Sequence, residues 1–271
     1  MSPLPTVPRI ARLGEGGRVW ALGALLGDDA AAATLVASLL ARWQKGDRLV
    51  VLGNMLGDRG DPARTLDLLL RLRRRLLATN FACDVHFLRG AQEEIWHKAL
   101  SLQFAMSPLG VLDWMLAHGL AATIAAYGGS ADEGRIACRG GPTAIARWTG
   151  SLRDLQAAHH PGHGELLNTL TRAAVTSNGR MVLSAAGVEA SRPLDEQADA
   201  FWWNGQTDAA LEASLAKSET AGWEGLARLV RGTGAAAGEA SDDSRVLTVS
   251  RDRPALVALD HDGTLLERIE A

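Results

Sequence analysis

Short glycine-containing segments, most of them directly after an apolar run, are the feature that most constrains how this chain can fold. Residues 18–22, 48–52 and 84–88 form apolar runs that predict buried strands, and residues 30–44 and 61–80 have leucines at helical spacing. Strands that alternate with helices in this way predict βαβ units and a largely parallel sheet.

Five such segments occur in order along the chain. They are Gly23–Gly27, Leu52–Gly60, Leu88–Glu93, Leu183–Gly187 and Val230–Thr233. Glycine at such positions lets two backbone segments approach each other closely or take up left-handed dihedral angles.

The rest of the chain divides into a few parts. With 271 residues, the chain is expected to form an N-terminal extension at 1–16 and one domain at 17–271. Residues 92–175 predict a mainly helical insertion, with a further helical stretch over about 151–173. Strands are expected at 180–185, 245–250 and 255–259, and a flexible loop at 233–243.

Composition limits the classes of function. The net charge of −3 does not favour nucleic acid as a partner. The two cysteines, Cys83 and Cys138, match no metal or redox spacing, which favours a reducing cytoplasm. Residues 1–18 lack the apolar core of a signal peptide, and charges interrupt the longer apolar stretches. We expect a soluble cytoplasmic protein with no membrane partner.

In their order and spacing, the five segments resemble the sequence blocks of the calcineurin-like metallophosphoesterases, close to the bacterial serine/threonine protein phosphatases. In that family the blocks are GDxHG, LGDxxDRG, LRGNHE, HAG and GH. The resemblance covers about residues 17 to 268 and implies an α/β fold, a four-layer α/β/β/α sandwich of two mixed sheets with a helical insertion. It also implies a site for two divalent ions, such as Mn, Fe or Zn, that activate a bound water.

The residues at the family's ligand positions cannot hold such a metal pair. They are Ala24, Leu26, Asn54, Ala91, Gln92, Ala185 and Thr233. Alanine and leucine have no ligand atoms, and neutral oxygen donors bind divalent ions weakly without carboxylates. We therefore expect no metal cofactor and no catalytic residues. The resemblance then implies a pseudophosphatase, a degenerate member that binds or regulates a protein partner or binds a phosphorylated ligand.

Two charged remnants of the blocks remain. Asp58-Arg59-Gly60 resembles the DRG of the second block, whose arginine helps to hold the substrate phosphate in the family. Arg59, with Asp58, is therefore a candidate anion-binding residue. The alternative is a loop residue that leads into the helix beginning at Asp61-Pro62. Glu93 also persists, and we expect it to support the loop rather than catalysis.

Two other hypotheses of function stay open. One is an active phosphoesterase, such as a serine/threonine phosphatase, that uses other ligands from Asp58, Glu93 and residues 159–163. The other is a purely structural subunit. The sequence His159-His160-Pro161-Gly162-His163 lacks a carboxylate or cysteine at ligand spacing, so it is interpreted as the start of a surface helix. The segment 258–265 is similar to a dehalogenase-type phosphatase motif, but Asp262-Gly263 is interpreted as a hairpin turn.

Overall fold

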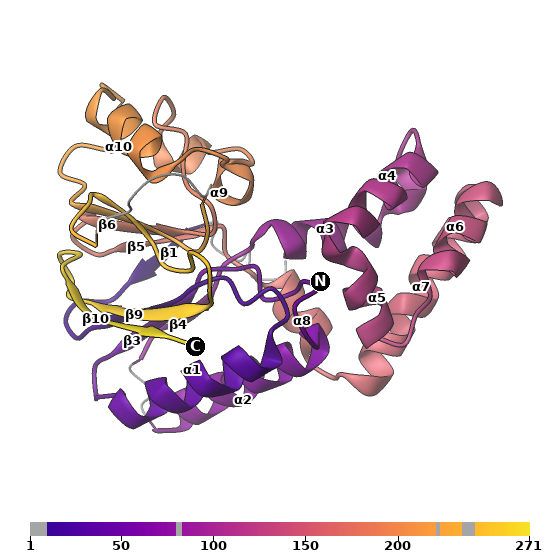
Figure 1. Cartoon of the computed structure of the whole chain (residues 1–271), viewed down its shortest axis with the longest axis horizontal. Coiled ribbons are helices and arrows are strands. Elements are labelled where there is room, and N and C mark those ends of the chain that lie inside the picture. The colour runs from indigo at the N-terminus through magenta and orange to yellow at the C-terminus, as the bar shows by residue number, and fades with distance from the viewer. Residues whose placement is uncertain (1–9, 80–82, 221–222, 235–241) are drawn as a thin grey trace, which may run out of the picture.

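The computed structural model describes residues 10–79, 83–220, 223–234 and 242–271, and it contains two five-stranded sheets that face each other (Figure 1). The first sheet has the order β1-β5-β6-β7-β8, formed by Ile10–Leu13, Ala173–Thr176, Met181–Ser184, Arg228–Arg231 and Val246–Thr248. The second has the order β10-β9-β2-β3-β4, formed by Leu265–Glu270, Ala255–Leu259, Val19–Leu22, Arg48–Val51 and Val85–Phe87.

Both sheets are mixed, and the parallel parts determine where the loops lie. In the second sheet β2, β3 and β4 run parallel, while β9 is antiparallel to β2. In the first sheet β6, β7 and β8 run parallel, and β5 is antiparallel to β6. A buried apolar cluster lies between the sheets and includes Leu183, Val230, Val50 and Val257. The inner faces of the sheets therefore share one core.

Helices cover the two outer faces and complete four layers. The helices α1 (Asp29–Arg42) and α2 (Pro62–Thr79) pack on the second sheet, where Leu35 and Leu66 belong to the same buried cluster as Trp20 and Leu49. Over the first sheet lie α9 (Ala200–Trp203) and α10 (Asp208–Ala216) (Figure 1). A short 3₁₀ turn, η3, covers Leu194–Glu196. The four-layer α/β/β/α sandwich with two mixed sheets is confirmed.

A helical insertion connects β4 to β5 and projects to one side of the sandwich (Figure 1). It contains α3 (Ala91–Ala99), η1 (Leu102–Phe104), α4 (Pro108–Met115), η2 (Leu116–Leu120), α5 (Ala121–Ala126), α6 (Ala131–Arg139), α7 (Pro142–His159) and α8 (His163–Asn168). Pro108–Ala126 is long and apolar enough to cross a membrane by length and composition alone, which we did not predict. However, Gly119 has a φ of 98° there, which interrupts the regular helix.

The structure differs from the sequence-based predictions in a few elements. Ile10–Leu13, placed in the N-terminal extension, forms β1 and pairs with β5 in parallel. The helical stretch predicted over about 151–173 comprises the end of α7 and all of α8, but it ends at Asn168, and Ala173 already belongs to β5. Asp262-Gly263 forms the turn between the antiparallel strands β9 and β10, as predicted. Most of the loop predicted over 233–243 lies outside the described residues.

Candidate functional site

The loops that follow the parallel strands meet where the two sheets come together. The amides of Leu25 and Leu26 donate to the Asn54 carbonyl at 3.1 and 2.7 Å. The Gln92 amide donates to Asn54 Oδ1 at 3.1 Å, and the Thr233 amide donates to the Ala185 carbonyl at 3.0 Å. These hydrogen bonds bring the first three glycine segments together, and likewise the last two.

The glycines are required by close approach of the backbone. Gly53 has a φ of 78°, and a Cβ there would lie 2.6 Å from the Gly90 nitrogen. A Cβ on Gly90 would lie 2.4 Å from the Asn54 nitrogen, and one on Gly232 would lie 2.9 Å from the Leu52 carbonyl oxygen. Because these distances are below van der Waals contact, a larger residue would force the loops apart. The glycines are therefore explained by loop packing alone.

The side chains at the predicted ligand positions form an apolar and neutral environment. Ala24, Ala185 and Asn54 are buried, while Leu26, Ala91, Gln92 and Thr233 are half-buried. Asn54 has a φ of 52°, and its side-chain oxygen accepts from the Gln92 amide. The Gln92 side-chain amide donates to the His118 carbonyl at 2.9 Å. The polar atoms of Asn54 and Gln92 thus already connect the loops.

Glu93 is the carboxylate at the centre of these loops, and backbone amides surround it. Its Oε1 accepts from the amides of Met55 (2.8 Å) and Leu56 (3.0 Å), and its Oε2 accepts from those of Asn54 (2.8 Å) and Gly90 (2.9 Å). Burial raises the pKa of the Glu93 carboxyl, and the four amide donors oppose that shift by stabilising the ionised form. The prediction that Glu93 supports the loop is confirmed, and its oxygens are committed to that role.

The other carboxylates near these loops also have partners or lie at the surface. Asp28 caps α1 by accepting from the Ala31 amide at 2.8 Å. Asp29 forms an ion pair with Arg64 at 3.3 Å. Asp58 is exposed.

Arg59, the candidate anion-binding residue, is also exposed, and its backbone amide donates to the Leu26 carbonyl at 2.9 Å. It lines a cavity of about 410 Å³ together with Asp28, Asp252 and Arg253. The cavity therefore mixes acidic with basic side chains. Anion binding by Arg59 stays a prediction.

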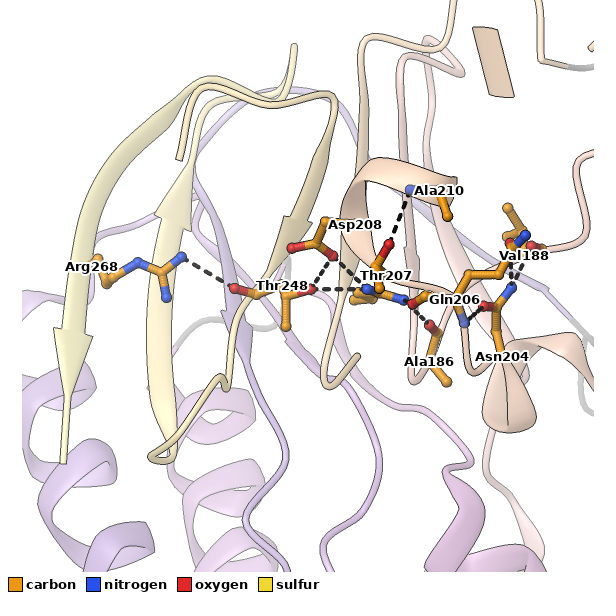
Figure 2. A network of polar contacts seen from close by, with 10 residues as sticks. Ala186, Val188, Asn204, Gln206, Thr207, Asp208, Ala210, Thr248 and Arg268 are labelled. Carbon is orange, nitrogen blue, oxygen red and sulfur yellow. Dashed lines mark hydrogen bonds and ion pairs between the residues drawn. The ribbon is translucent and has the colours of Figure 1, made fainter. Parts of the chain in front are cut away.

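A buried arginine inside the last glycine segment has a role that the sequence-based prediction missed. Arg231 ends β7 and is 0% exposed. Its guanidinium donates to Asp208 at 2.5 and 2.9 Å, to Thr248 Oγ1 at 2.9 Å, and to the carbonyls of Ala186 and Gln206 at 3.1 and 2.9 Å. Figure 2 shows these four partners gathered from α10, β8 and the loops that follow β6 and α9. The network fixes the loop that carries Thr233 against α10.

Contrary to the sequence-based prediction, the histidine-rich segment 159–163 does not lie wholly at the surface. The interpretation as the start of a surface helix is wrong for His163, which opens α8 but is 0% exposed. Its Nε2 lies 3.1 Å from Asp67 Oδ1, and its Nδ1 lies 3.1 Å from the Tyr127 hydroxyl. His159, in contrast, is exposed. The carboxylate partner comes from α2, so spacing within 159–163 could not reveal it.

Two solved structures that this chain resembles are described as phosphatases. A putative diadenosine tetraphosphatase matches with a TM-score of 0.51 and 15% identity over 97% of this chain and 98% of the other. A cold-active protein tyrosine phosphatase matches with a TM-score of 0.50 and 12% identity over 97% of this chain and 82% of the other. The chain has a phosphoesterase-like fold. No protein-family model matches it, and neither does any curated protein sequence.

Proposed function

We propose that this protein is a pseudophosphatase, a degenerate metallophosphoesterase-fold protein that binds a partner without hydrolysing phosphate esters. The observation that carries this proposal is that backbone amides occupy both oxygens of the Glu93 carboxylate. Both oxygens of Glu93 accept two backbone amides each. A metal ion there would have to displace those donors and leave them buried without partners.

The surrounding positions support the same conclusion. Ala24, Leu26, Ala91 and Ala185 offer no ligand atom. A dinuclear site needs several charged or imidazole ligands to hold two cations close together. The neutral oxygens of Asn54 and Thr233 do not replace them. Hydrolysis through two metal ions at this edge is therefore not expected.

A binding role is supported by apolar side chains on the helical insertion. Phe104, Met106, Trp114 and Ile136 are exposed by 82%, 103%, 46% and 65%. Trp114 also contacts Trp203 of α9, with ring centroids 6.0 Å apart. Exposed apolar surface of this kind is typical of protein interaction sites. A cytoplasmic protein partner that covers the insertion is part of the proposal.

Activity measurements test the loss of hydrolysis. The full chain is assayed with added Mn²⁺, Fe²⁺ or Zn²⁺ on a phosphomonoester, a phosphodiester, phosphoserine and phosphotyrosine peptides and a dinucleoside tetraphosphate. We expect no turnover above the buffer with metal. Metal-dependent turnover that co-purifies with the protein and disappears in Asp58→Ala would establish the active-phosphoesterase alternative instead.

Replacement of the exposed apolar residues tests the binding role. The double variant Phe104→Ser/Met106→Ser changes side chains that contribute little to the core, so the fold is expected to persist. We expect it to lose a partner that the wild-type protein retains on an affinity column. Leu266→Ser is the matched control, since Leu266 is 53% exposed on β10, away from the insertion. Equal retention by all three proteins would contradict this interface.

A further inference from the structure

Three side chains that lie far apart in sequence meet beside the helical insertion. Asp67 comes from α2, His160 follows the last residue of α7, and His163 opens α8. One ligand atom from each lies within 4.8 Å of the others. His163 Nε2 is 3.1 Å from Asp67 Oδ1, and His160 Nδ1 is 3.7 Å from Asp67 Oδ2. Both carboxylate oxygens thus face imidazole nitrogens.

The turn between the two histidines holds their rings side by side. Gly162 has a φ of 94°, and the His163 amide donates to the His160 carbonyl at 3.2 Å. The imidazole rings stack with centroids 5.0 Å apart and an interplanar angle of 25°. A left-handed residue is needed for this turn, and glycine supplies it. The backbone therefore presents the two rings to Asp67 in a fixed arrangement.

One nitrogen of this cluster lacks the partner that burial normally requires. His160 Nδ1 is buried, and it has no hydrogen-bond partner among the residues that the structure describes. Buried polar atoms are nearly always satisfied, so an exception calls for an explanation such as a bound ion. A cation between Asp67 and the two rings would accept the lone pair of this nitrogen.

The opposite nitrogen of His163 has the environment of a metal ligand. His163 Nδ1 lies 3.1 Å from the hydroxyl of Tyr127, which is 1% exposed. A histidine that binds a metal through one nitrogen usually donates its other N–H to a neighbouring acceptor, which fixes the ring orientation. With Nε2 bound to a cation, Nδ1–H would donate to the Tyr127 oxygen.

From this geometry we propose that Asp67, His160 and His163 form a mononuclear site for a divalent transition metal ion, of which Zn²⁺ is the expected occupant. Two imidazole nitrogens and one carboxylate oxygen are ligands that Zn²⁺ binds well. Tetrahedral zinc ligands lie about 3.4 Å apart, given zinc–ligand distances of about 2.0–2.1 Å. The two measured nitrogen–oxygen separations, 3.1 and 3.7 Å, lie on either side of that value.

Two of the three ligands reach solvent, and one of them borders a cavity. His160 lines a cavity of about 580 Å³, which it shares with Trp96, Arg153 and Glu165. The Asp67 side chain is 37% exposed and that of His160 is 22% exposed, whereas His163 is fully buried. Three protein ligands with one open position are the arrangement in which zinc retains a water molecule.

This site is separate from the glycine loops. Asp67, His160 and His163 are not among the residues at the resembled family's ligand positions. Metal binding at Asp67 would therefore leave the proposed loss of dinuclear hydrolysis untouched. Absence of hydrolysis would not argue against metal binding either. The two proposals are tested by different measurements, metal content for one and turnover for the other.

Metal binding by the intact chain tests the proposal. The protein is freed of metal with a chelator, dialysed against Zn²⁺ and analysed by elemental mass spectrometry. We expect about one Zn²⁺ per chain. We also expect Co²⁺ to give the intense visible absorption of a four-coordinate site, which Zn²⁺ then displaces. A wild-type protein that retains no Zn²⁺ and gives only the spectrum of aqueous Co²⁺ would overturn the proposal.

Variants locate the ion. Asp67→Asn and His160→Gln change partly exposed side chains that would bind the ion directly. Each is expected to lower Zn²⁺ affinity by more than about 100-fold, which exceeds the loss expected for a residue that only hydrogen-bonds to a ligand. Tyr127→Phe keeps the ring volume and is expected to lower affinity by about 10- to 100-fold. His159→Gln, the matched control one residue away, is expected to bind like the wild type. Equal binding by Asp67→Asn and the wild type would place the ion elsewhere and overturn the proposal.

Discussion

At the scale of single residues, a few buried polar side chains hold the glycine loops together. The two oxygens of Glu93 accept hydrogen bonds from four backbone amides. Asn54 likewise uses its side chain to accept from the Gln92 amide. Both residues join the loops of β3 and β4. Loop packing therefore explains the glycine segments without any metal ion.

Replacement of Glu93 by glutamine should destabilise the whole fold. The glutamine side chain has one acceptor oxygen in place of two, and its NH₂ group would face amide donors. Because hydrogen bonds to a buried charged acceptor are strong, we expect Glu93→Gln to lower the free energy of unfolding by about 3 kcal/mol. Urea denaturation followed by circular dichroism measures this loss.

Glu94→Gln is the matched control for that measurement. Glu94 forms ion pairs with Arg89 at 3.0 Å and Lys98 at 3.3 Å, and Lys98 is half exposed. Glu94 is buried, but Glu94→Gln keeps an acceptor oxygen for partners that reach solvent, so the control should lose less than Glu93→Gln. Equal losses of unfolding free energy in the two variants would show that the four amide hydrogen bonds to Glu93 do not stabilise the fold beyond an ordinary ion pair.

At the scale of elements, local patterns predicted the elements with strong periodicity and missed those that depend on distant partners. The helices near 30–44 and 61–80 and the strands before the first three glycine segments were predicted from leucine spacing and apolar runs. In contrast, β1 has only four residues, two of which are Ala11 and Arg12, and it pairs with β5 far along the chain. Such a strand has no local signal.

The same reason explains the missed parts of the two sites. His163 was assigned to the surface because its partner Asp67 lies 96 residues earlier in the sequence, on α2. Arg231 was missed because its four partners come from separate elements (Figure 2). Residue types within one segment predict a loop or helix there. Contacts between segments appear only once the chain is folded.

A glycine in the β3 loop should tolerate no side chain. Gly53 has a φ of 78°, and a Cβ there would lie 2.6 Å from the Gly90 nitrogen. Gly53→Ala therefore combines an unfavourable dihedral angle with a backbone clash, and we expect a loss of about 3 kcal/mol or more in unfolding free energy. Thermal unfolding of the purified variant measures it.

Gly179→Ala separates the two causes. Gly179 has a φ of 71° in the turn before β6, but a Cβ there would meet nothing within 4 Å. Only the dihedral cost applies, which is about 1–2 kcal/mol for a left-handed residue. If Gly53→Ala lowered the free energy of unfolding no more than Gly179→Ala, the β3 and β4 loops would not approach each other as closely as described.

At the scale of the whole molecule, stability depends on a few buried charges that join distant parts of the sandwich. Asp47, in the loop between α1 and β3, is 2% exposed. Its Oδ2 lies 2.7 Å from the Arg18 guanidinium and accepts from Trp20 Nε1 at 2.8 Å and from the Gln44 amide at 2.9 Å. Burial alone would raise the pKa of this carboxyl. The hydrogen bonds from Arg18, Gln44 and Trp20 outweigh burial and lower the pKa below its usual value near 3.8.

This lowered pKa predicts how global stability changes with pH. A carboxyl with a lower pKa in the folded state stabilises the fold fully above its unfolded pKa, and that contribution disappears as the pH falls through the folded value. Asp47→Asn should therefore cost about 2 kcal/mol at pH 7 and progressively less below about pH 5. Unfolding free energies measured between pH 7 and pH 3 for both proteins would show the two curves converging toward acid.

Asp58→Asn, at an exposed carboxyl, is the control and should stay within about 0.5 kcal/mol of the wild type throughout. Parallel curves for Asp47→Asn and the wild type would show that ionisation of Asp47 does not stabilise the fold.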